Sequence, residues 1–255
     1  MNKDRNAPSR KAFDPAKLQA LLEHLGRLLP DEKQRQAFYS CSQTQPPASL
    51  RLNPLQAQSQ TLEPLLRQLG EPVPWCEDAF GMPESEKGLG QMLEHAMGAL
   101  YVQAKAPMLA VEVLAPRPGE RVLDLCAAPG GKTAQLLARG ARVTAVERSA
   151  KRLQRLQQNM TRLGFSAETV CADANVWKPD EQVDAVLLDA PCSATGTIRR
   201  HPDIPYLKTQ SDVDSLSGAQ FRLLEVALDM VKPGGKLVFC TCSLQPEEGP
   251  ELIEK

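Results

Sequence analysis

The chain has 255 residues, enough for one large domain or for a domain with a smaller companion. Its 42% hydrophobic and 24% charged residues are ordinary for a globular protein, and its formal net charge of −1 excludes a global basic field as a means of attracting nucleic acid. No apolar run approaches the roughly 18 residues that a membrane helix needs, and the polar N-terminus lacks a signal-peptide core. We therefore expect no membrane partner.

The first 114 residues are predicted to be mainly helical. Residues 1–15 are predicted to be a flexible tail, and apolar residues at helical spacing predict an amphipathic helix over 16–29. A short strand over 49–53 and a helix over 56–69 are expected next. Residues 71–90 are rich in Pro, Gly and charged residues and are predicted to form a loop, and two helices are predicted over 93–114. Residues 16–114 would thus form a small N-terminal cap and linker.

From residue 115 to 255 the pattern changes to alternating strands and helices. The strands are predicted over 121–125, 142–146, 168–171, 183–188 and 236–240, and the helices over 132–139, 149–163 and 217–231. Ser149 is a predicted N-cap and Gly164 a predicted helix stop. Such alternation predicts an α/β fold with a parallel, Rossmann-like sheet and helices on both faces. After the fifth strand only a charged helix start, 247–255, is expected.

A glycine-rich turn joins the first of these strands to its helix. Residues 124–133 are Asp-Leu-Cys-Ala-Ala-Pro-Gly-Gly-Lys-Thr, in which glycines allow close backbone approach and the helix start offers free amide donors. Glu147 ends the second strand and Asp173 follows the third, which together indicate a nucleoside cofactor. The dinucleotide pattern G-x-G-x-x-G is absent, and Cys126 stands where a phosphate loop requires its first glycine.

Two of the seven cysteines follow strands at the edge where α/β sheets bind ligands. Cys192 comes after the fourth strand and Cys242 after the fifth, a placement that indicates nucleophilic thiols. Cys126, Cys171 and Cys240 are predicted to serve packing only. The odd cysteine count without a secretory signal favours reduced thiols and the cytoplasm, and the lack of a CxxC pair predicts no metal site.

Three motifs, in this order, resemble the RNA (cytosine-5) methyltransferases that use S-adenosylmethionine, in their bacterial rRNA branch. They are Leu125-Cys-Ala-Ala-Pro-Gly-Gly-Lys-Thr133, Asp189-Ala-Pro-Cys-Ser193 and Thr241-Cys-Ser243. Upstream, Ser49–Asn53, Pro74–Glu77 and the segments around Glu94 and Tyr101 resemble the same branch. The resemblance implies the class I methyltransferase fold. The usual sheet of that fold has two more strands, which this sequence is expected to lack.

The resemblance also implies roles for site residues. Cys242 would attack C6 of the cytosine, Cys192 would assist release, and Asp189 would lie between the cofactor and the base, contacting both. Glu147 would bind the ribose hydroxyls and Asp173 the adenine amino group. The methionine and ribose part would be wrapped by Cys126, Ala127, Ala128, Pro129, Gly130, Gly131 and Lys132.

RNA is the expected partner, ribosomal RNA first and transfer RNA as an alternative. Arg199, Arg200 and Lys208 form the best local basic cluster, which would grip phosphates beside the target base. The N-terminal region would either contact RNA or serve only as a structural helper. Two other readings stay open: a methyltransferase for DNA or a small molecule, and a truncated, non-catalytic protein that binds S-adenosylmethionine or RNA. The Thr241-Cys-Ser243 motif argues against DNA, for which the nucleophile lies in the Pro-Cys motif.

Overall fold

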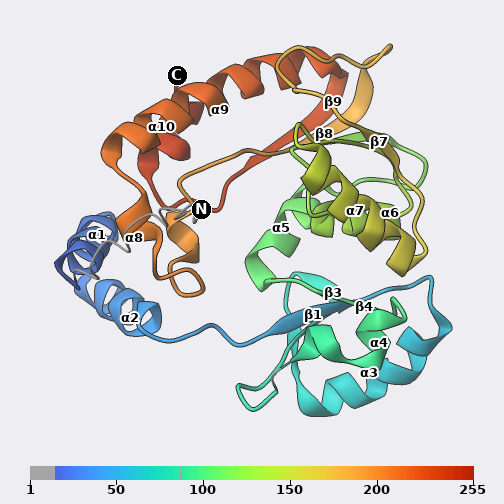
Figure 1. Ribbon diagram of the computed structural model, residues 1–255, viewed down its shortest axis with the longest axis horizontal. Helices are drawn as coiled ribbons and strands as arrows, with labels where there is room; N and C mark the ends of the chain where they lie inside the picture. Colours follow the sequence, from blue (N-terminus) through green and yellow to red (C-terminus); the bar gives the residue numbers. More distant parts are fainter. Residues whose placement is uncertain (1–14, 87) are drawn as a thin grey trace, which may run out of the picture. The chain divides into compact units, whose positions relative to one another are not determined.

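The computed structural model describes residues 15–86 and 88–255 (Figure 1). The predicted flexible tail lies outside these residues, apart from Pro15, with which helix α1 begins. The chain divides into two compact units. The larger unit comprises Pro47–Pro191 and Gly218–Thr241, and the smaller unit comprises the described residues up to Pro46 together with Cys192–Ser217 and Cys242–Lys255.

A five-stranded parallel sheet forms the centre of the larger unit, as predicted. Its strand order is β7-β6-β5-β8-β9, and every neighbouring pair is parallel. The strands are β5 (Arg121–Leu125), β6 (Arg142–Val146), β7 (Glu168–Val170), β8 (Val183–Asp189) and β9 (Val231–Cys240). The last strand begins earlier than expected because Val231 pairs with Val183 before the register shifts around the Pro-Gly-Gly segment.

Helices cover both faces of this sheet, which confirms the doubly wound α/β class. On one face α5 (Lys105–Leu114), α6 (Gly131–Ala138) and α7 (Ala150–Leu163) pack against side chains such as Val143 and Ala145. On the other face α9 (Gln210–Met230) packs against the alternate side chains, among them Leu123 and Leu125. The two sets alternate along each strand because successive strand residues point to opposite faces.

Helix α7 illustrates how local sequence sets an element's ends. The Ser149 side chain accepts a hydrogen bond from the Arg152 amide, which caps the first turn as predicted. Gly164 ends the helix with a φ of 73°, a conformation that suits glycine. The apolar side chains between these ends are buried on one stripe, namely Leu153, Leu156, Met160 and Leu163.

The N-terminal part of the larger unit contains a sheet that the sequence did not predict. It is antiparallel, with the order β2-β3-β1-β4, and α3 (Ala57–Leu69) packs on it. Its strands are β1 (Ser49–Leu52), β2 (Glu71–Val73), β3 (Cys76–Gly81) and β4 (Leu100–Val102). The expected loop over 71–90 was therefore wrong, and β4 interrupts the expected helices between α4 (Leu93–Ala96) and α5. Strands β2 and β4 have only three residues each, too few to show periodicity, and the packing of Leu50 and Phe80 of this sheet against α3 stabilises them.

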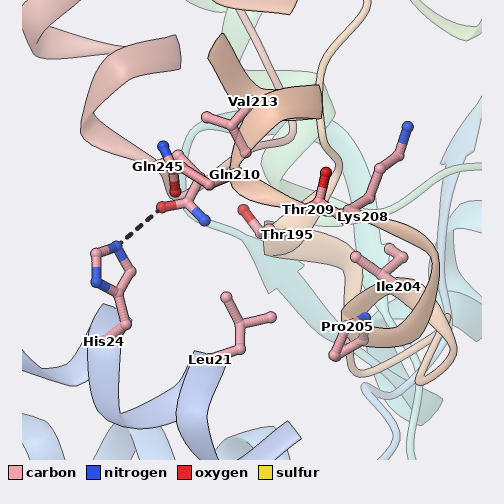
Figure 2. A pocket seen from close by; sticks show the side chains of 10 residues that line it. All are labelled: Leu21, His24, Thr195, Ile204, Pro205, Lys208, Thr209, Gln210, Val213 and Gln245. Atoms are coloured by element: carbon pink, nitrogen blue, oxygen red, sulfur yellow. Dashed lines mark hydrogen bonds between the residues drawn. The ribbon is translucent and has the colours of Figure 1, made fainter. Parts of the chain in front are cut away.

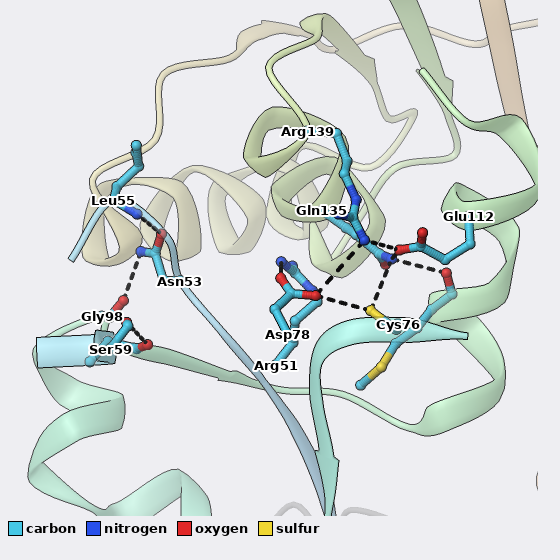
Figure 3. A network of polar contacts seen from close by, with 12 residues as sticks. Arg51, Asn53, Leu55, Ser59, Cys76, Asp78, Gly98, Glu112, Gln135 and Arg139 are labelled. Atoms are coloured by element: carbon cyan, nitrogen blue, oxygen red, sulfur yellow. Dashed lines mark hydrogen bonds and ion pairs between the residues drawn. The ribbon is translucent and has the colours of Figure 1, made fainter. Parts of the chain in front are cut away.

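A buried polar network joins this antiparallel sheet to helices of the parallel sheet (Figure 3). Arg51 of β1 is 1% exposed, and its Nη1 lies 3.6 Å from Oδ2 of Asp78 on β3. Arg139, at the end of α6, lies 3.9 Å from Asp78 and donates to Glu112 of α5 at 2.6 Å. Gln135 of α6 donates to the same Glu112 oxygen at 2.8 Å. These contacts thus link the charged side chains of the antiparallel sheet to those of helices α5 and α6 in one continuous network.

The smaller unit is helical and is described by itself. It contains α1 (Pro15–Arg27), α2 (Glu32–Ser42), α8 (Ile204–Leu207), the start of α9 and α10 (Pro250–Ile253), with short 3-10 turns η2 (Thr195–Thr197) and η3 (Pro246–Glu248). Helix α1 confirms the predicted amphipathic helix, whereas α2, capped by Asp31, was not predicted. Leu22, Ile198 and Ile204 form its apolar core.

Candidate active site

A left-handed turn leads from β5 into α6 and forms the predicted glycine-rich loop. Cys126 and Gly130 have positive φ angles of 63° and 98°. A Cβ on Gly130 would lie 3.0 Å from side-chain atoms of Leu156 and Met160, so only glycine allows this close packing on α7. Two side chains of α7 hold the loop carbonyls, which sequence reasoning missed: Arg152 donates to Ala128 O at 2.7 Å and Asn159 to Pro129 O at 2.8 Å.

Glu147 directly follows β6 and is 3% exposed. Its Oε1 accepts a hydrogen bond from the Ser149 amide at 2.9 Å. Its Oε2 lies 3.3 Å from an Arg152 nitrogen, yet it accepts no hydrogen bond. A buried carboxylate oxygen with unused acceptor capacity fits a ligand that brings hydroxyl groups.

Asp173 lies beyond the end of β7 and is more open to solvent than Glu147. Its Oδ1 accepts from the backbone amide and the side-chain amide of Asn175, and the backbone hydrogen bond is the main reason that its pKa lies below the usual range. Its other oxygen lies 3.9 Å from Arg148. This carboxylate is therefore held by its own turn.

Asp189 ends β8, the strand next to β5, where the strand order reverses direction. Ligands of open α/β sheets bind at such a switch point. Lys132, at the start of α6, donates to Asp189 at 2.7 Å. Burial opposes the charge of Lys132, but Asp189 and other nearby acidic groups outweigh it and raise its pKa. Lys132 therefore stays protonated.

Three cysteines were predicted to serve packing only. Burial, followed by the charges of Glu147 and Asp189, raises the pKa of Cys126 to about 12, and burial with Asp189 also raises that of Cys240. Both are thus poor nucleophiles at neutral pH. Cys171 is exposed, so the packing prediction was wrong for it, because the strand β7 ends one residue earlier, at Val170.

In the smaller unit, Cys192 and Cys242 lie together, although they are 50 residues apart in the chain. Their sulfur atoms are 3.2 Å apart. The Gly196 amide donates to Cys242 O at 2.9 Å, and a Cβ on Gly196 would lie 2.7 Å from that oxygen. Glycine at this position therefore lets the two cysteine segments approach.

The hydrogen bond with Cys242 and burial both raise the pKa of Cys192. Either sulfur can donate the hydrogen bond between them, so the two thiols form one hydrogen-bonded pair. The family resemblance alone predicts different roles for the two cysteines.

A cluster of hydroxyl groups supports the two cysteine segments, and we call it the hydroxyl cluster: Ser193, Thr195 and Ser243. Ser193 Oγ and Thr195 Oγ1 lie 3.0 and 3.1 Å from Ser243 Oγ. The Leu244 amide donates to Thr195 Oγ1 at 2.9 Å. Ser193 and Ser243 each follow a cysteine directly, which is the one signal in the sequence for this cluster.

A pocket of about 200 Å³ lies in the same unit (Figure 2). Thr195 and Gln245 line it beside α1, and His24 contacts the Gln245 side chain at 3.1 Å. Thr209 and Gln210 also line it and bond to nearby acidic side chains. These polar side chains thus make hydrogen bonds within the smaller unit, and we assign the pocket no ligand.

The three residues of the predicted basic cluster have different surroundings within the smaller unit. Arg199 donates to the backbone and side-chain oxygens of Thr44, at 2.9 and 3.1 Å, and so braces the segment after α2. Lys208 is exposed and lines the pocket, and Arg200 is exposed. Among the residues that the structure describes, no group of three or more His, Cys, Asp or Glu side chains could hold a metal ion. Within the same residues no helix is both long and apolar enough to span a membrane.

The sheet order, the glycine-rich loop after β5 and the acidic residue after β6 define a Rossmann-like fold of the kind found in S-adenosylmethionine-dependent methyltransferases. The model of the 16S rRNA methyltransferase RsmB/F family matches residues 111–255, and that of the N-terminal domain of 16S rRNA methyltransferase RsmF matches residues 19–105. The chain belongs to the RsmB/F methyltransferase family.

Individual relatives agree with this assignment. Ribosomal RNA small subunit methyltransferase B of Vibrio cholerae is 40% identical over 236 residues, which are 89% of this chain and 54% of the relative. The protein of the same name from Erwinia tasmaniensis is 41% identical over the same shares. The chain thus spans about half the length of these relatives.

Two solved structures are similar to the whole chain. A methyltransferase homolog from Pyrococcus horikoshii is 30% identical, with a TM-score of 0.79 over 94% of this chain and 81% of that chain. NSun6 from the same organism, at 19% identity and a TM-score of 0.77 over 92% of this chain and 85% of that chain, shares the fold.

Proposed function

We propose that this chain transfers a methyl group from S-adenosylmethionine to C5 of a cytosine in RNA, with ribosomal RNA as the substrate class. The 3.2 Å separation of the Cys192 and Cys242 sulfurs carries the proposal. Two thiols at this distance, joined by a hydrogen bond, suit a reaction that forms and then breaks a bond to one base. The names of the relatives support RNA of the small ribosomal subunit.

In this mechanism Cys242 is the nucleophile. Its thiolate adds to C6 of the cytosine, which breaks the C5–C6 double bond and makes C5 electron-rich. Bound S-adenosylmethionine would supply an electrophilic methyl group for C5 and leave as S-adenosylhomocysteine. A base would then take the C5 proton, and the freed electron pair would re-form the C5–C6 double bond and expel the Cys242 thiolate, with Cys192 assisting this release. Asp189, with its negative charge held by Lys132, would bind the N3 and amino side of the base.

The cofactor residues are proposed from the larger unit. The backbone of residues 126–131 and Lys132 would surround the methionine and ribose part, and the unused Oε2 of Glu147 would accept from the ribose hydroxyls. Asp173 would accept from the adenine amino group. The orphaned, buried Glu147 oxygen is the observation that fits this ligand, because a ribose presents two hydroxyl donors.

We further propose a division into an N-terminal domain over 16–114 and a catalytic domain over 115–255, located in the cytoplasm. The two family models support this division, because one ends at residue 105 and the other begins at residue 111. Arg200 and Lys208 are the proposed phosphate contacts, whereas Arg199 would act by bracing the segment that carries them.

The test traps the covalent intermediate. Cys192→Ala protein is incubated with S-adenosylmethionine and small-subunit ribosomal RNA, and a protein–RNA adduct is sought on a denaturing gel. We expect an adduct that is absent in the Cys192→Ala/Cys242→Ala double variant, because release is blocked but attack is not. Cys242→Ala alone should lose methyl transfer and keep cofactor binding, while Cys171→Ala, an exposed cysteine, serves as the matched control.

The proposal fails if the folded, cofactor-binding Cys192→Ala protein forms no adduct with this RNA. An adduct with transfer RNA alone would move the substrate class to transfer RNA. Full methyl transfer by Cys242→Ala would overturn the assignment of the nucleophile.

A further inference from the structure

Glu248 is a buried carboxylate for which the proposed mechanism has no use. It lies in the turn η3, soon after Cys242, and is 0% exposed. Both of its oxygens accept from one residue: Ser193 N donates to Oε1 at 2.8 Å and Ser193 Oγ donates to Oε2 at 2.5 Å. A carboxylate is costly to bury unless it is hydrogen-bonded, so this contact is a specific feature of the fold.

The two hydrogen bonds fix both the position and the orientation of Ser193. Ser193 follows Cys192 directly, so the carboxylate fixes the peptide that carries the Cys192 thiol. Ser193 Oγ also lies 3.0 Å from Ser243 Oγ, and Ser243 follows Cys242. Glu248 therefore holds the hydroxyl cluster at the point where the two cysteine segments meet.

We infer that Glu248 is a positioning residue for the pair of thiols, an inference that rests on the proposed function. It holds Cys192 at the distance from Cys242 at which Cys192 assists release. Its carboxylate acts through Ser193 and does not touch the base. Displacement of a reacting group by about 1 Å can cost on the order of 100-fold in rate. Loss of Glu248 should therefore lower the rate of the release step, which depends on Cys192, more than the rate of attack by Cys242.

Glu248→Gln is the direct test, because it keeps the shape of the side chain and replaces one acceptor oxygen by an NH2 donor. That donor faces Ser193, which already donates twice. We expect turnover of small-subunit ribosomal RNA to fall by about 10- to 100-fold. We also expect the covalent adduct to accumulate, as in Cys192→Ala but to a smaller extent. Loss of folding alone would lower adduct and turnover together.

Glu251→Gln is the matched control, since Glu251 lies three residues further along and is exposed. Its turnover should equal that of the unmodified protein. Ser193→Ala removes one of the two hydrogen bonds to Glu248 and gives a second, milder test that holds even where Glu248→Gln fails to fold. The Ser193→Ala/Glu248→Gln double variant should be no slower than Glu248→Gln, because both changes break the same link.

The inference is overturned if the Glu248→Gln and Ser193→Ala proteins turn over like the Glu251→Gln protein. It is also overturned if either variant, shown to be folded and to bind S-adenosylmethionine, loses turnover without any accumulation of adduct. Absence of turnover and of adduct in the unmodified protein would instead refute the proposed function. The two failures are therefore distinguishable in one set of assays.

Discussion

Glu147 and Asp173 follow neighbouring strands, yet the structure gives the two carboxylates different surroundings. Glu147 is buried and keeps one oxygen without a hydrogen bond, whereas the Asp173 side chain is 38% exposed and bonds to Asn175. A buried acceptor that accepts no hydrogen bond within the protein has more to gain from a ligand donor than one already satisfied. Glu147 is therefore the stronger determinant of cofactor affinity of the two.

Glu147→Ala should weaken binding of S-adenosylmethionine by about 10- to 100-fold, because hydrogen bonds to charged groups contribute about 1.5–3 kcal/mol. Isothermal titration calorimetry measures the Kd. Glu181→Ala is the control, since Glu181 is exposed and lies just before β8, at the opposite end of the sheet. An unchanged Kd in a folded Glu147→Ala protein would argue against this placement of the ribose.

Asp124 predicts a pH dependence of stability. Burial raises its pKa from 3.8 to about 7, and a hydrogen bond from Thr133 opposes this change. Because the folded-state pKa is the higher one, the unfolded chain loses its proton first. The contribution of Asp124 to stability is therefore fully present below about pH 4 and is lost as the pH rises to about 7.

Asp124→Asn never ionises, so the free energy of unfolding of the unmodified protein should fall relative to this variant between about pH 4 and pH 7. The slope is at most about 1.4 kcal/mol per pH unit. Urea unfolding at several pH values measures it. For Asp212→Asn the sign should be reversed, because hydrogen bonds from Thr209 lower the pKa of Asp212. A difference that does not vary with pH would contradict the prediction.

Single residues also show what the sequence could and could not predict. The Ser149 cap and the Gly164 stop follow from local chemistry and are confirmed. Glu248 could not be found, because its partner Ser193 is 55 residues away and nothing near Glu248 in the sequence indicates burial. A hydrogen bond between segments this far apart in the sequence can be identified only from the three-dimensional structure.

At the scale of elements, the longer, mostly apolar strands could be predicted from the sequence, and the strands of three residues could not. Strands β5, β6 and β8 are rich in Val, Leu and Ala, most of which are buried, the pattern of a buried parallel sheet. Strands β2 and β4 have three residues each, and their partners in the sheet stabilise them. The antiparallel sheet therefore appears only in the tertiary structure.

The polar network between the two sheets should be important for stability. Asp78→Ala would leave the buried Arg51 guanidinium without its carboxylate partner, and removing one member of a buried pair costs about 3–5 kcal/mol. Arg121→Met, which removes an exposed ion pair with Glu181, should cost less than about 1 kcal/mol. Urea unfolding compares the two variants. Equal losses would show that the Arg51 network contributes no more than a surface pair.

At the scale of the whole molecule, the alternation of strands and helices was enough to predict a parallel sheet, which the structure confirms. Parallel strands bring their carboxyl ends to one edge, so residues following β5, β6 and β8 were expected there. The sequence did not predict three features: the polar network around Arg51, the division into two compact units, and the hydrogen bonds of Arg199 to Thr44. Each depends on contacts between segments distant in sequence, about which local periodicity is silent.

Because their sulfur atoms lie 3.2 Å apart, we expect Cys192 and Cys242 to form a disulfide under oxidising conditions. A small disulfide such as oxidised glutathione can form a mixed disulfide with one thiol and release one glutathione. The second thiol then displaces the other glutathione, so that Cys192 and Cys242 become one disulfide and two reduced glutathiones are produced.

After treatment of the protein with oxidised glutathione, mass spectrometry should find no bound glutathione on either cysteine. Turnover should be lost in the treated protein and should return on addition of dithiothreitol. A mixed disulfide that persists would contradict this prediction. Since the proposed reaction needs both thiols reduced, methylation by this chain would cease in an oxidising environment without any loss of the fold or of the cofactor residues.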